Sequence, residues 1–211
     1  TCEAAIADQR LDYAAWAYLA TAWRMLGDER EHWLCDYDRL VMPIDVPDLE
    51  GGMDALEFAA QVADCLDRWH GTLRAPGNQS LRGGTETSGA LFDRVYPLLM
   101  RLKHALSVQI KAAIDALPED SDHPFLSRKS KAFKFAGSWS VRLASSGHHV
   151  PHFHPAGWIS SAYYARLPQA MGTGDVGHQG WIGFGTPPDI LGLEIPPCRM
   201  VEPHAGKLVL F

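Results

Sequence analysis

Four histidines lie within seven residues of this chain, in the run His148-His149-Val150-Pro151-His152-Phe153-His154. Neutral imidazole is the commonest protein ligand for iron, zinc and copper. Alternate side chains of an extended segment share a face, so His148, His152 and His154 are expected on one side and His149 on the other. An H-x-H pair on a strand can direct two imidazoles at one ion. The run therefore predicts a metal site at His152 and His154, with His148 and His149 beside the ion or exposed.

Helices are expected to precede this run. Apolar periodicity, capping residues and prolines predict them at 13–26, 28–42, 54–70 and 88–117. The first two would form an αα-hairpin joined at Gly27 and ended by Pro43, a spacing that resembles a tetratricopeptide repeat. The positions that carry this likeness are Trp16, Leu19, Ala20, Leu26, Gly27, Tyr37 and Pro43. Because single repeats need neighbours to bury their faces, this hairpin is expected to pack on further helices or on the rest of the chain.

The period changes after about residue 138, where alternating apolar and polar residues replace the helical pattern. Strands are expected at 139–143, 148–154, 158–167, 180–184 and 199–211, and the segment 71–87 is expected to be a polar loop. Several short strands separated by turn residues favour a sandwich or barrel. The predicted fold class is therefore α+β, with a helical segment at 1–76 followed by a β-barrel domain at 77–211.

Composition narrows the classes of partner. The chain has 211 residues, 46% hydrophobic and 21% charged, with a formal net charge of −6. An acidic balance argues against nucleic acid or an anionic membrane as the main partner, and no apolar run reaches the roughly 20 residues of a membrane span. Four scattered cysteines favour a reducing, cytoplasmic location. Since the chain starts at Thr1 and stops inside an apolar run at Phe211, it is expected to be a fragment.

The strand region resembles the double-stranded β-helix, a jelly-roll barrel, of iron(II)/2-oxoglutarate-dependent oxygenases. It is most similar to a bacterial subgroup that often follows tetratricopeptide repeats. The likeness extends from about residue 78 to the end, with the last barrel strands missing. It is carried by the segments Gln79–Thr85, Ser138–Leu143, His152–Pro155, Gly157–Tyr164 and Pro203–Phe211.

The resemblance implies Fe(II) as the metal, 2-oxoglutarate as co-substrate and a dioxygenase that hydroxylates its substrate. His152 takes the place of the first histidine ligand, and His154 stands where the family has a carboxylate. Tyr164 matches a tyrosine that binds the distal carboxylate of 2-oxoglutarate. Arg142 is expected either in the same pocket or paired with a carboxylate elsewhere. The family's second histidine and its 2-oxoglutarate arginine are expected after Phe211, which leaves His204 as a substitute third ligand.

Three alternatives stay open from the sequence. Tyr164 can equally be a residue that only packs in the core of the barrel, because aromatic side chains fill so much of any core. The barrel can be a cupin-like module that binds a metal or small molecule without oxygenase chemistry, which the missing carboxylate at His154 favours. The chain can also act through its helical segment as a protein-interaction module with an inactive barrel. The substrate, a small molecule or a protein, is not indicated by the sequence.

Overall fold

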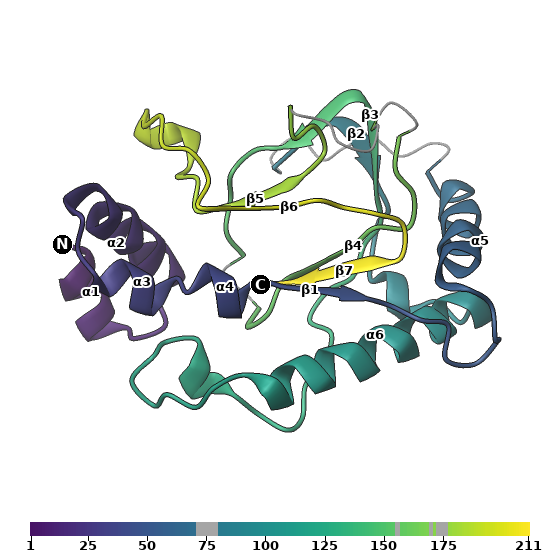
Figure 1. Ribbon diagram of the computed structural model, residues 1–211, viewed down its shortest axis with the longest axis horizontal. Coiled ribbons are helices and arrows are strands. Elements are labelled where there is room, and N and C mark those ends of the chain that lie inside the picture. Colours follow the sequence, from purple (N-terminus) through teal and green to yellow (C-terminus); the bar gives the residue numbers. More distant parts are fainter. Residues whose placement is uncertain (71–79, 155–156, 169–170, 172–176) are drawn as a thin grey trace.

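The computed structural model describes residues 1–70, 80–154, 157–168, 171 and 177–211. Helices and antiparallel sheets are both present, which confirms the mixed class (Figure 1). In Figure 1 the N-terminal helices lie at one end of the molecule and helix α5 lies at the other, with the strands between them. Within the described residues, no helix combines the length and apolar character needed to cross a bilayer.

The N-terminal helices are α1 (Cys2–Asp8), α2 (Tyr13–Leu26), α3 (Arg30–Leu34) and α4 (Tyr37–Leu40). Asp12 caps α2 by accepting from the backbone N–H of Ala15, and Gly27 ends it in the left-handed conformation at φ 67°. The helix predicted at 28–42 is instead broken into α3 and α4, because Asp36 caps a new helix there. The tetratricopeptide likeness stays a prediction.

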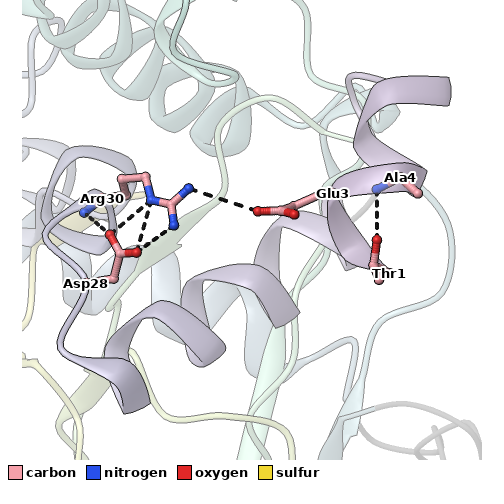
Figure 2. A network of polar contacts seen from close by, with 5 residues as sticks. All are labelled: Thr1, Glu3, Ala4, Asp28 and Arg30. Atoms are coloured by element: carbon pink, nitrogen blue, oxygen red, sulfur yellow. Dashed lines mark hydrogen bonds and ion pairs between the residues drawn. The ribbon is translucent and has the colours of Figure 1, made fainter.

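A charged contact links the start of α3 to α1. Arg30 pairs with Asp28 (Nη2–Oδ2 2.6 Å) and reaches Glu3 (Nη1–Oε1 4.0 Å), as Figure 2 shows. The hydrogen bond from Arg30 lowers the pKa of the Asp28 carboxyl to about 2. All three groups lie at the surface, where such pairs contribute little to stability.

The central sheet joins residues from distant parts of the chain. Strand β7 (Lys207–Leu210) lies between β1 (Met42–Asp45) and β4 (Ser161–Tyr163), and both neighbours are antiparallel to it. Leu208 and Leu210 of β7 are fully buried. The strand predicted at 158–167 is much shorter, since β4 covers only Ser161–Tyr163. Strand β1 begins at Met42, where a predicted helix was expected to end.

Two helices pack against one face of this sheet. They are α5 (Ala55–Asp67), capped by Asp54, and α6 (Pro97–Ala116), which begins with proline in its first turn. The main core combines both helices with the sheet, through Phe58, Val62, Leu102, Leu106 and Leu208 among others. The helix predicted from residue 88 begins only at α6, because a short 3₁₀ turn, η1 (Leu91–Asp93), precedes it.

The remaining strands form two antiparallel pairs, β2 (Leu81–Glu86) with β3 (Val141–His149) and β5 (Ile182–Phe184) with β6 (Arg199–Val201). Two further 3₁₀ turns are η2 (Leu126–Arg128) and η3 (Asp189–Leu191). Strand β2 lies where a polar loop was predicted. None of the three sheets of the described residues closes into a barrel, so the jelly roll stays a prediction. The predicted domain boundary at 76/77 lies outside the described residues.

Candidate metal centre

The β2–β3 pair positions the histidine run. Leu81 pairs with His149 and Arg82 with His148, and the register shifts between Arg82 and Gly84. Two glycines make this shift possible, since a Cβ on Gly147 would lie 2.0 Å from the carbonyl oxygen of Gly83. Strand β3 therefore ends at His149, and His152 and His154 follow it as irregular chain. The prediction that one continuous strand aligns them on one face is wrong.

His152 and His154 nevertheless meet at their ring nitrogens. The two Nε2 atoms are 2.9 Å apart, and the ring centroids are 4.9 Å apart. Two nitrogens about 2.1 Å from one ion, at roughly a right angle, would be about 3.0 Å apart. The pair therefore has the spacing of two adjacent ligands, although the bend of the chain after β3 produces it rather than the pleat of a strand.

The backbone sets the tautomer of His152. Its Nδ1 lies 2.8 Å from the carbonyl oxygen of Val150. Because a carbonyl oxygen only accepts hydrogen bonds, Nδ1 carries the proton and Nε2 keeps its lone pair. Metal-ligating histidines are held in this way, with the second ring nitrogen donating to a carbonyl or carboxylate. Nε2 of His152 therefore accepts a hydrogen bond from Nε2 of His154, and this proton would have to leave Nε2 of His154 for both nitrogens to bind one ion.

Ser80 and His149 flank the pair on one side. The Ser80 Oγ lies 3.0 Å from Nδ1 of His149 and 3.4 Å from Nε2 of His152. The rings of His149 and His152 are stacked, with centroids 5.8 Å apart. Partial burial, and then the charges of the neighbouring imidazoles, lower the pKa of His149. His149 therefore favours its neutral form beside the pair.

Trp139 covers the other side. Its ring stacks on His154 with centroids 6.0 Å apart and stays 46% exposed. Burial, and then the charge of His152, lower the pKa of His154. Both effects favour the neutral imidazole, which is the form that binds a metal. Trp139 lies in the segment predicted to be a strand, but nothing in the sequence indicates its contact with His154.

The described residues contain no group of three or more histidine, cysteine or carboxylate side chains placed to hold a metal. His152 and His154 fit as two ligands. His148 is directed elsewhere, with Nδ1 3.3 Å from the carbonyl oxygen of Ser146. His204 pairs with Asp45 across 3.0 Å. Pro155, the last residue of the motif, lies outside the described residues.

The other predicted site residues lie in different surroundings. Tyr164 packs against the cluster of Val41, Val201 and Val209, and burial raises its pKa to about 12. Arg142 lies on β3, where its Nη1 is 3.7 Å from Oδ1 of Asp67, and its side chain is 59% exposed. Within the described part of the chain, neither residue forms a hydrogen bond or ion pair with the two histidines.

Sequence reasoning missed a buried histidine next to the β2–β3 pair. His70 is 5% exposed, and its two ring nitrogens lie 2.9 Å from Thr85 Oγ1 on β2 and 2.9 Å from Ser140 Oγ. Burial, followed by the charge of Arg142, lowers its pKa. Both nitrogens are therefore occupied, and His70 links the β2–β3 pair to the chain that follows α5. The sequence placed His70 at the end of an ordinary helix, so nothing in its position indicated these contacts.

Part of this chain matches a known protein family. Residues 137–211 match the model of a family described as "Putative 2OG-Fe(II) oxygenase". Comparison with curated proteins and with solved structures gives no significant match. The matched segment contains Trp139, Arg142, Tyr164 and both histidines of the pair. It supports a relationship of this segment to the iron(II)/2-oxoglutarate oxygenase superfamily.

Proposed function

We propose that this chain is a non-haem iron(II), 2-oxoglutarate-dependent dioxygenase that hydroxylates an organic substrate, with His152 and His154 as two ligands of the metal. The observation that carries the proposal is the 2.9 Å approach of the two Nε2 atoms inside the matched segment. Tyr164 is proposed as a contact of 2-oxoglutarate on the strength of the resemblance alone. Arg142 is proposed as a second contact, which is one of the two roles that the sequence left open; its 3.7 Å approach to Asp67 fits the other role, pairing with a carboxylate.

Each neighbouring residue has a defined task in this proposal. The Val150 carbonyl orients His152, Trp139 shields His154 on one side, and Ser80 holds His149 close to the pair. Bound iron(II) with 2-oxoglutarate would supply activation of dioxygen for oxidation of a C–H bond. With imidazole at position 154 instead of a carboxylate, the site carries one negative charge fewer. This change favours an anionic co-substrate.

The test is iron-dependent conversion of 2-oxoglutarate to succinate by the purified chain. Wild type and a His148→Ala control are expected to form succinate only when iron(II) is present. His152→Ala and His154→Ala are each expected to lose this turnover while keeping the same far-UV circular dichroism. Equal succinate formation by all four proteins would refute the assignment of the pair.

A second candidate is a metal-binding module without oxygenase chemistry. It is favoured by the absence, among the described residues, of a third ligand grouped with the pair. This module would bind one metal per chain through His152 and His154 and form no succinate. Stoichiometric metal without turnover, lost in both variants, would select it over the dioxygenase.

A further inference from the structure

A second concave site lies away from the histidine pair. A cavity of about 510 Å³ opens between α6, η1 and residues 133–138. This volume is within the range of small-molecule sites, roughly 300 to 1,000 Å³. We propose that the cavity binds a small organic anion with a planar aromatic body. The proposal does not depend on the oxygenase assignment.

Three phenylalanines form one wall of the cavity. Phe92 and Phe135 meet edge to face with ring centroids 5.0 Å apart, and Phe133 and Phe135 do so at 5.8 Å. Phe133 is 36% exposed, so part of its ring faces solvent. Aromatic rings prefer such tilted contacts, each of which adds about 0.5–1.5 kcal/mol beyond burial. A planar ring of the ligand would add a further aromatic contact to these three and cover the exposed part of the Phe133 ring.

Two lysines supply the charge. The Nζ of Lys103 lies 5.8 Å from the Phe135 centroid and donates to the carbonyl oxygen of Phe92 at 3.4 Å. An ammonium has three donors, so Lys103 keeps two for a ligand. Lys134 also lines the cavity and is exposed, and no described residue pairs with its ammonium. Asp93 is the one acidic side chain among the described residues of the lining, which leaves these residues a net charge of about one positive, suited to a single anionic group.

The wall is fixed in place before any ligand arrives. Ser138 accepts from the backbone N–H of Phe92 with its Oγ at 3.0 Å and from the N–H of Leu91 with its carbonyl at 2.7 Å. These bonds hold η1 against Ser138, the last residue of the segment 133–138. Ser107 donates its hydroxyl to the carbonyl of Lys103 within α6, so it has no proton left for the ligand. Affinity is therefore expected from the rings and lysines.

The test compares two dyes by fluorescence titration. The anionic dye 8-anilinonaphthalene-1-sulfonate is expected to saturate one site on the folded chain. The double variant Lys103→Gln/Lys134→Gln should weaken it about tenfold, while the neutral dye N-phenyl-1-naphthylamine changes less than about twofold. Lys131→Gln, an exposed lysine of the same loop that does not line the cavity, serves as the matched control. Loss of both dyes together, or equal loss in the control, would overturn the proposal.

A filled cavity gives an independent test that leaves both lysines intact. Ala136 lines the cavity on an exposed loop, so Ala136→Trp can occupy it without disturbing the core. Both dyes are expected to lose saturable binding, while the thermal unfolding midpoint stays at the wild-type value. Retained binding in this variant would place the dyes elsewhere and refute the site. Absence of saturable binding of either dye to wild type would refute it as well.

Discussion

Replacing Asp48 by asparagine is expected to lower the free energy of unfolding by about 2 kcal/mol at pH 7. Asp48 lies in the connection between β1 and α5, and its side chain is 1% exposed. Its Oδ2 accepts from Arg101 Nη2 of α6 at 2.6 Å and from the backbone N–H of Met53 at 3.2 Å. Its Oδ1 accepts from the N–H of Gly51 at 3.1 Å. The carboxylate therefore ties the loop before α5 to α6.

The magnitude comes from the pKa of this carboxyl. Burial by itself raises the pKa, but the hydrogen bonds from Arg101 and from the backbone outweigh it and lower the pKa from 3.8 to about 2. At about 1.4 kcal/mol per pH unit, this difference corresponds to about 2 kcal/mol. Because the folded-state pKa is depressed, the stabilisation is present above the unfolded value and is lost as pH falls through the folded one. Roughly half of it is gone by about pH 3.

Urea unfolding at pH 7, 5 and 3 measures both the loss and its pH dependence. The difference in unfolding free energy between Asp48→Asn and wild type should be largest at pH 7 and smaller at pH 3. Asp115→Asn is the matched control, since its side chain is 55% exposed and pairs only with Lys111 among the described residues. The control should stay within about 0.5 kcal/mol of wild type. An Asp48→Asn variant as stable as this control at pH 7 would refute the reasoning.

Three further predictions concern the β2–β3 pair and the histidines near it. In an NMR titration, the pKa of His154 should lie below that of a free imidazole and rise in His152→Ala, because the neighbouring charge is removed; an unchanged value would contradict the contact. Binding of cobalt(II) should quench the fluorescence of Trp139, and Trp139→Phe should remove most of the quenching, with Trp181→Phe as the control. His70→Ala should cost about 2 kcal/mol in thermal or urea unfolding, because it removes a buried side chain and leaves the half-buried hydroxyls of Thr85 and Ser140 without their partner; a change below about 0.5 kcal/mol would contradict this.

Local signals predicted α2, α5 and α6, whereas α1 was not predicted and α3 and α4 were expected as one helix. The left-handed Gly27 and the proline at the start of α6 each act within one turn, so the sequence alone locates them. Strands β1 and β2 escaped prediction because their partners are remote. Met42 pairs with Leu210, and Gly83 passes against Gly147, which makes a glycine-rich segment extended instead of looped.

The site was predictable in its residue types but not in its geometry. The H-x-H spacing identified His152 and His154, and the structure brings their Nε2 atoms together. The two rings were expected to meet on one face of a strand. They meet instead because the chain bends after His149. Ser80 reaches the pair from before β2, a contact that depends on pairing between strands far apart in sequence. Whether Tyr164 and Arg142 contact a co-substrate stays a prediction.

Anaerobic titration of iron(II) into the purified chain tests the central claim most directly. Wild type and His148→Ala are expected to bind about one ion per chain. His152→Ala and His154→Ala should each lose at least about 100-fold in affinity, more than removal of an orienting neighbour produces. Wild-type affinity in either of these two variants, or an equal loss in His148→Ala, would contradict a metal centre at this pair.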